Sequence, residues 1–99
     1  MEFLYRIRPT RLEMLEDEGT PEEQRLVGEH FAYLQRLTSD GVVTLAGRTQ
    51  TVGPDSFGII TFEADDEAAA QAVVDGDPGV AGGVFEAELF PFRTALRGG

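Results

Sequence analysis

The chain has 99 residues, of which 41% are hydrophobic, and this length suits one compact domain over residues 1–99 with a single core. Its 18 acidic residues outnumber the 8 basic ones, and the formal charge of −10 argues against nucleic acid and anionic membranes as partners. No apolar run reaches the roughly 20 residues of a transmembrane helix, and the N-terminus lacks the pattern of a signal peptide, so we expect a cytoplasmic protein.

The missing residue types restrict the chemistry further. Cysteine and lysine are absent, which excludes disulfides as well as thiolate and Schiff-base mechanisms. A catalytic zinc ordinarily takes histidine or cysteine ligands, and His30 is the single histidine. Any metal site would therefore have to be rich in carboxylates, and we predict neither a metal nor a cofactor.

The first predicted element is a strand. Side chains of residues 2–8 alternate with a period of two, and the pattern ends at Pro9. The acidic stretch 10–19 follows, with Leu12 and Leu15 three residues apart. This spacing fits either a brief helix or an ordered loop, and the role of the stretch stays open.

The firmest helix signal begins at Thr20. Thr20 is a suitable N-cap, Pro21 suits the first helical position, and Glu23 completes a capping box. Apolar residues then recur at helical spacing until Gly41 supplies a C-terminal stop. We predict a helix from about Pro21 to about Asp40.

Two β-branched stretches, residues 41–49 and 57–63, predict a hairpin, because the turn sequence Gly-Pro-Asp at 53–55 lies between them. The second strand of the hairpin is apolar on both faces, with Phe57 and Ile59 on one and Ile60 and Phe62 on the other. Both faces should therefore be covered, one by helices and the other by the sheet of a partner.

A second helix is predicted from a cap at Asp65 to about Gly76, and a last strand over 84–93 with Pro91 near its end. The order β-α-β-β-α-β is that of a ferredoxin-like α+β sandwich, with an antiparallel four-stranded sheet and both helices on one face. The first and last strands are neighbours in this topology. Positive Arg6 and Arg8 should then face negative Glu86 and Glu88.

His30 is the residue with the clearest chemical potential. It lies at the centre of the apolar face of the long predicted helix, so its ring should point toward the sheet or a cleft beside it. There it can act as a general acid or base, or be a neutral packing histidine. Asp77, held extended by Pro78, is the candidate partner; Asp75 is a rival, and turn formation is the alternative role of Asp77.

Three further residues have side chains that a site could use. Arg48, at the end of a strand, can bind an anionic substrate group or be a solvated surface arginine. Tyr33, next to His30 on the helix surface, can orient a hydroxylated ligand or simply pack. Ser56 has no neighbouring base in the sequence, so a serine nucleophile is not supported.

Several motifs together resemble the YciI-like, or YCII-related, family over most of the chain. They are the H-x-x-Y-L pattern at His30, Tyr33 and Leu34, a glycine at Gly47, the pair Asp77-Pro78 and the pair Pro91-Phe92. The resemblance implies a dimeric α+β barrel, in which two protomers pack sheet against sheet, and a His-Asp active site at His30 and Asp77. Branches of the family include lyases that eliminate halide from chlorinated hydroxyaromatics.

The chain departs from the family pattern in its acidic stretch before the long helix and in the glycine-rich segment 77–83, which we expect to open or loosen the pocket. Two functions compete. One is a small cofactor-independent lyase or isomerase in which His30 moves a proton on a small organic substrate while Asp77 orients the ring. The other is a non-catalytic dimeric module that binds a small metabolite or protein partner. A pair at a solvent-connected pocket favours the enzyme, and a sealed pair favours the module.

Overall fold

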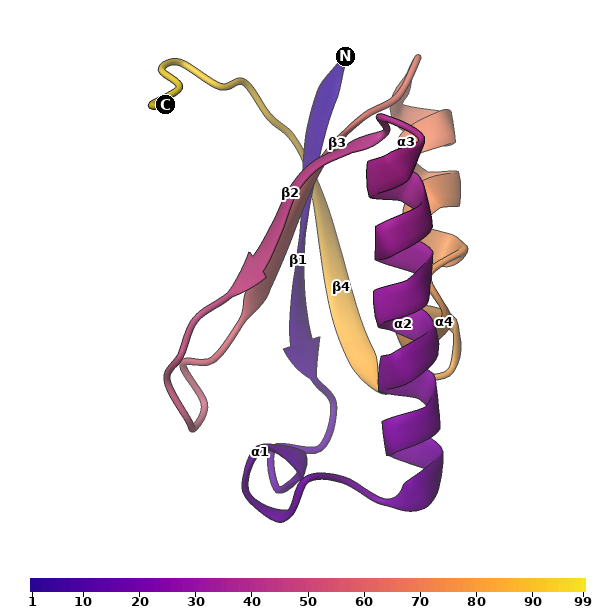
Figure 1. Ribbon diagram of the computed structural model, residues 1–99, viewed down its shortest axis with the longest axis vertical. Coiled ribbons are helices and arrows are strands. Elements are labelled where there is room, and N and C mark those ends of the chain that lie inside the picture. The colour runs from indigo at the N-terminus through magenta and orange to yellow at the C-terminus, as the bar shows by residue number, and fades with distance from the viewer.

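The computed structural model describes all residues 1–99 as a four-stranded antiparallel sheet with its helices on one face, except for a short helix near the N-terminus that lies beyond the end of the sheet (Figure 1). The strand order is β2-β3-β1-β4, so the first and last strands are neighbours as predicted. This is the predicted ferredoxin-like α+β arrangement. The strands are β1 (Glu2–Pro9), β2 (Val43–Arg48), β3 (Gly58–Glu63) and β4 (Phe85–Pro91); the helices are α1 (Met14–Asp17), α2 (Pro21–Ser39), α3 (Glu67–Asp75) and α4 (Pro78–Ala81).

The core lies between the sheet and α2 and α3. Alternate residues of β1 and β3 point into it, as the period-two pattern predicts, and meet apolar side chains of the helices. Burial of this apolar surface is the main force that holds the layers together. The buried members are Phe3, Tyr5, Ile7, Leu34, Val43, Ile60, Phe62, Ala70 and Val74.

The opposite face of the sheet carries no helix (Figure 1). It mixes charges with apolar side chains, and Leu45 and Phe90 are 52% and 40% exposed. The predicted cross-strand pairing is confirmed, since Arg6 lies opposite Glu88 with Nη2 2.6 Å from Oε1. One of the two faces that the sequence predicts to be covered is thus open in a single chain.

The helix ends follow local chemistry. The predicted capping box of α2 is confirmed, because the Thr20 side chain accepts from the Glu23 amide and the Glu23 carboxylate accepts from the Thr20 amide. The predicted cap Asp65 is wrong by one residue. Asp66 is the residue with extended backbone, and its Oδ1 accepts from the Ala69 amide at 2.7 Å.

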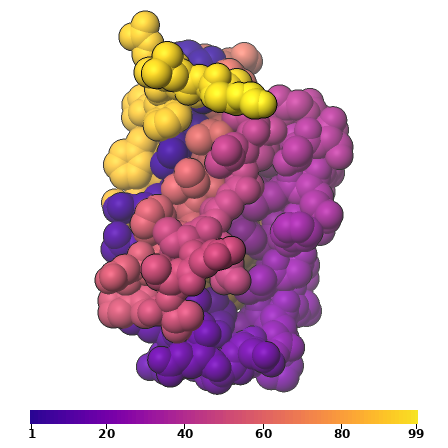
Figure 2. Space-filling model, turned by 60° about the vertical axis from the view of Figure 1, so that its left-hand side comes forward, coloured from indigo at the N-terminus to yellow at the C-terminus, as the bar shows by residue number.

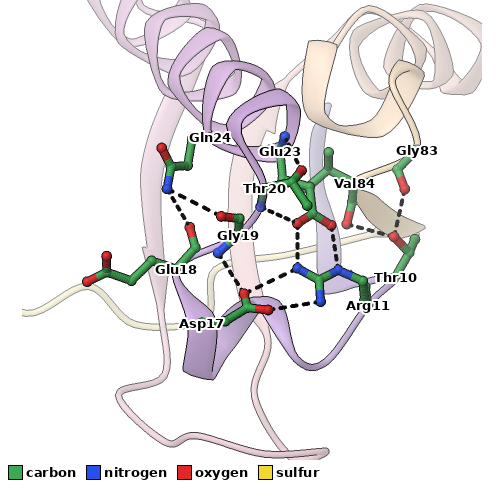
Figure 3. A network of polar contacts seen from close by, with 10 residues as sticks. All are labelled: Thr10, Arg11, Asp17, Glu18, Gly19, Thr20, Glu23, Gln24, Gly83 and Val84. Atoms are coloured by element: carbon green, nitrogen blue, oxygen red, sulfur yellow. Dashed lines mark hydrogen bonds and ion pairs between the residues drawn. The ribbon is translucent and has the colours of Figure 1, made fainter.

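The acidic stretch 10–19 is held in place by Arg11 (Figure 3). The guanidinium donates to both oxygens of Glu23, at 2.7 and 3.0 Å, and to both oxygens of Asp17, at 3.1 and 3.2 Å. The hydroxyl of Thr10 donates to the carbonyl of Gly83 at 2.7 Å. The stretch therefore contains the short helix α1 and is tied to the start of α2 and to the segment before β4.

This Arg11 network gives stability a dependence on acid pH. Bonds from Arg11 hold the pKa of Glu23 at about 2, below its usual 4.5, and also lower the pKa of Asp17. A lowered pKa stabilises the fold above about pH 4.5, and the contribution is lost as the pH falls toward 2. We expect the melting temperature of Arg11→Met, measured by circular dichroism, to fall less between pH 5 and pH 2 than that of the parent protein.

Arg36→Met is the control, because it removes a cation that binds no carboxylate, and its melting temperature should fall with pH as the parent's does. An equal fall in the parent and in Arg11→Met would contradict the role of the Arg11 network.

None of the helices combines the length and apolar content that crossing a membrane requires.

Candidate functional site

His30 and Asp77 meet beneath α2. The ring nitrogen Nδ1 of His30 lies 2.8 Å from both carboxylate oxygens of Asp77. Asp77 is fully buried and His30 is 8% exposed. The two residues are 47 positions apart in the sequence, so the fold brings together the pair that the sequence analysis singled out.

Asp77 is oriented by the backbone of its own turn. It precedes Pro78, has extended backbone, and serves as the N-cap of α4 by accepting from the Gly79 amide with Oδ1 at 2.9 Å. The other carboxylate oxygen, Oδ2, accepts from the hydroxyl of Tyr5 at 2.8 Å. The turn role and the partner role of Asp77, set out as alternatives from the sequence, therefore coexist.

The protonation of the pair follows from its donors. Burial, and then the charge of Asp77, raise the pKa of the Tyr5 phenol, which therefore stays protonated and remains a donor. An ionised carboxylate only accepts hydrogen bonds, so Nδ1 of His30 must carry the proton that points at Asp77. In the neutral ring, Nε2 is then left with a free lone pair, as a general base requires.

The free nitrogen is not sealed in. Nε2 makes no hydrogen bond within the chain, and no buried side-chain nitrogen or oxygen lacks a partner, so Nε2 retains contact with solvent. Figure 2 shows a narrow gap between the β2–β3 hairpin, α2 and the segment of α1. The pair is thus buried at its carboxylate end and accessible at Nε2.

A family assignment rests on a match to the whole of this arrangement. The model of the YCII-related domain matches residues 1–93, which include every element described above. The chain belongs to the YCII-related family. A search of curated protein sequences finds no match.

A solved structure of another protein has the same fold as this YCII-related protein. It is the 5-chloro-2-hydroxyhydroquinone dehydrochlorinase TftG from Burkholderia phenoliruptrix AC1100, in complex with 2,5-dihydroxybenzoquinone. The two chains are similar with a TM-score of 0.68 at 21% identity, over 94% of each chain. At this identity the comparison supports the shared ferredoxin-like fold.

The glycine-rich segment of this YCII-related protein does not loosen the site, contrary to expectation. A Cβ on Gly79 would lie 2.7 Å from Cδ2 of Phe85 and 3.1 Å from Cβ of His30. The Phe85 ring in turn packs 4.9 Å from the His30 ring, centroid to centroid. Glycine is needed here because α4 approaches both α2 and β4 too closely for any side chain.

This close approach predicts opposite effects for two glycines. Gly79→Ala should lower the free energy of unfolding by about 1–3 kcal/mol, because the new methyl group displaces Phe85 or His30. Gly28→Ala, on the exposed face of α2 with no atom within 4 Å of its Cβ position, should raise it by about 0.5–1 kcal/mol. Urea unfolding measures both; a neutral Gly79→Ala would show that the segment adapts.

The other candidate residues do not bond to the pair. The hydroxyl of Tyr33 donates to the carbonyl of Val73 at 2.6 Å, and the rival carboxylate of Asp75 accepts from Gln71 at 2.9 Å. Arg48 is exposed, forms no ion pair, and lies opposite Gly58, whose Cβ position faces Ile7 on the helix-bearing side of the sheet. The predicted ligand-binding roles of Tyr33 and Arg48 stay predictions.

Two surface hollows, one over β2 and β3 and one between the stretch 10–19 and the hairpin turn at Gly53 and Pro54, are lined by neither His30 nor Asp77. The first, of about 300 Å³, lies over β2 and β3, where Leu45, Phe57, Ile59 and the predicted site residue Arg48 are among the residues that line it. No three His, Asp or Glu side chains are grouped closely enough to hold a metal ion. The prediction that no metal or cofactor is used stays a prediction.

Tyr5 is the member of the site that the sequence analysis missed. Its strand position indicates burial between Phe3 and Ile7, but its partner lies 72 residues away. The available signal was chemical, since a tyrosine on a fully buried strand face needs a hydrogen-bond partner for its hydroxyl.

Proposed function

We propose that this protein is a small cofactor-independent lyase or isomerase in which Nε2 of His30 is the general base and Asp77 orients and stabilises the ring. The observation that carries the proposal is that the two ring nitrogens of His30 differ in their surroundings. Nδ1 is fixed on a buried carboxylate, while Nε2 has a free lone pair and contact with solvent. A histidine that served packing alone would need no such unpaired nitrogen.

The reaction we propose is an elimination from a chlorinated hydroxyaromatic compound. Nε2 takes the proton of one hydroxyl and returns it to the ring carbon that bears chlorine, which gives the keto tautomer of the substrate. It then takes the proton of a second hydroxyl, the electron pair moves through the ring to form the quinone, and the carbon–chlorine bond breaks to release chloride. Asp77 stabilises the imidazolium that forms, and water then takes its proton, so the net loss is HCl. The substrate class comes from the name of the structural neighbour, a dehydrochlorinase.

We further propose that the substrate reaches His30 through the gap between the hairpin and α2 (Figure 2). Arg48 lies at the end of β2 in the hairpin, where it also lines the hollow over β2 and β3, and its unpaired guanidinium suits a phenolate or another anionic group. In this proposal Tyr33 supports the wall of the site, because its hydroxyl is already bound to Val73.

A homodimer completes the proposal. The open face of the sheet presents Leu45, which lines the hollow over β2 and β3, and Phe90 of β4, and a second copy packed sheet against sheet would cover it. Sedimentation velocity measures this directly. A monomer at micromolar concentration would contradict the dimer.

A non-catalytic module that binds a small metabolite or protein is the second candidate, and one observation favours it. Asp77 is fully buried, and neither of the two surface hollows described above reaches the pair. In that case the pair fixes the packing of α4 against α2. Its removal would lower stability, and neither the parent nor the variant would show catalytic activity.

Chloride release from a panel of chlorinated hydroquinones and catechols, followed with a chloride electrode and by ultraviolet absorbance, tests the enzyme. We expect catalytic turnover of at least one compound, and no turnover by His30→Ala at the same concentration. Equal chloride release by the two proteins would contradict the role of His30. Thermal shift with non-reactive hydroxyaromatics would then show whether binding alone remains, as the module requires.

A further inference from the structure

Tyr5 completes the set of donors around Asp77. It lies in the middle of β1 on the helix-bearing face, is fully buried, and donates to Oδ2 at 2.8 Å. The other two donors, His30 and the Gly79 amide, come from α2 and α4. Tyr5 is therefore the one donor that fastens the carboxylate to the sheet.

We propose that Tyr5 is a positioning residue whose bond to Asp77 fixes the His30 ring and sets the readiness of Nε2 to accept a proton, an inference that rests on the proposed function of the pair.

The carboxylate of Asp77 can rotate unless both of its oxygens are held. Nδ1 is equally distant from both carboxylate oxygens, so His30 alone leaves the carboxylate free to turn about its Cβ–Cγ bond. The Gly79 amide holds Oδ1 and the Tyr5 hydroxyl holds Oδ2. Two fixed oxygens define the plane of the carboxylate, and with it the direction in which Nε2 points.

The Tyr5 hydroxyl also changes the charge on the Asp77 carboxylate. A hydrogen bond from Tyr5 draws negative charge from the carboxylate and makes it a weaker acceptor for Nδ1. A weaker acceptor stabilises the imidazolium less, so the ring releases its proton more readily and is neutral over a wider pH range. A general base must be neutral before it can act.

Few other groups can exert the same control on Asp77. No arginine pairs with Asp77. Phe85 of β4 packs against His30 but carries no charge. Tyr33 of α2 is the other titratable neighbour, but its hydroxyl donates to the Val73 carbonyl. The chain has only two tyrosines, so Tyr33 is a matched control for Tyr5.

Nuclear magnetic resonance can test the inference without a substrate. His30 is the only histidine, so the pH titration of the imidazole signals is unambiguous. In Tyr5→Phe we expect the titration midpoint to rise by about one pH unit relative to the parent, as the loss of one charge-assisted hydrogen bond implies. Tyr33→Phe should titrate as the parent does. An unchanged midpoint in folded Tyr5→Phe would overturn the inference.

A second measurement covers the case in which Tyr5→Phe does not fold. Biosynthetic 3-fluorotyrosine in the Tyr33→Phe background places fluorine on Tyr5 alone and makes its hydroxyl a stronger donor. The midpoint should then fall relative to unlabelled Tyr33→Phe; no change would overturn the inference. If the midpoints move as expected but chloride release does not depend on His30, the positioning role stands and the proposed function fails. If release depends on His30 and the midpoints do not move, the reverse holds.

Discussion

His30→Asn is expected to reduce turnover by about 10²- to 10⁴-fold, the contribution typical of a general base. The amide nitrogen of asparagine takes the place of Nδ1 and can still donate to Asp77, so the buried carboxylate keeps its partner. What the substitution removes is Nε2, the nitrogen that makes no hydrogen bond within the chain. Steady-state chloride release measures the change, and circular dichroism confirms that the variant is folded.

The neighbouring Glu29→Gln variant is the matched control for His30→Asn. Glu29 is an exposed residue of the same helix and pairs with Arg25, so its charge can be removed without touching the pair. Its turnover should stay within about twofold of the parent, as expected for a surface substitution remote from the pair. Turnover by His30→Asn at the level of this control would exclude His30 as the base.

Most of the fold was predictable because its signals are local. The period-two pattern of β1, the capping box at Thr20 and the turn at 53–55 each depend on residues within a few positions of one another, and each predicts an element that the structure contains. The cap of α3 was misplaced by one residue because Asp65 and Asp66 offer the same side chain, and only the backbone conformation distinguishes them.

The helix α4 was not predicted for a related reason. Its four residues begin at Pro78 and include Gly79, and the pair Asp77-Pro78 equally favours a turn. Packing decides the outcome, because the absence of a Cβ at Gly79 lets the segment approach Phe85 and His30. The glycines therefore indicate close contact, whereas composition alone suggests a loose loop.

The site was predictable in part. His30 was found from its place on the apolar face of the helix, and Asp77 from its place before a proline. The third member, Tyr5, bonds to a residue 72 positions later, with β2 and β3 between them in the chain, and no local pattern records such a contact. Sequence reasoning therefore identified which side chains carry chemistry, and the fold determined which of them are bonded together.

Asp77→Ala is expected to be the most destabilising substitution at the site, at about 3–5 kcal/mol, because it leaves donors buried without an acceptor. The groups that lose their partner are Nδ1 of His30, the Tyr5 hydroxyl and the Gly79 amide. This is a large share of the 5–15 kcal/mol or so that stabilises a typical domain, so the variant should unfold at low urea concentration or fail to fold. Asp75→Ala, at an exposed position two residues away, should stay within about 0.5 kcal/mol of the parent.

Asp77→Asn separates the structural from the chemical role of this carboxylate. Its amide oxygen can still accept from the Gly79 amide and the helix cap survives, so less stability should be lost than in Asp77→Ala. The amide nitrogen, however, donates toward Nδ1 and favours the tautomer in which Nε2 carries the proton. A proton on Nε2 removes the base, so we expect turnover to fall about 10²-fold or more in a folded protein. Loss of under about 1 kcal/mol in Asp77→Ala, or full turnover in Asp77→Asn, would show that the ring is oriented by something other than this carboxylate.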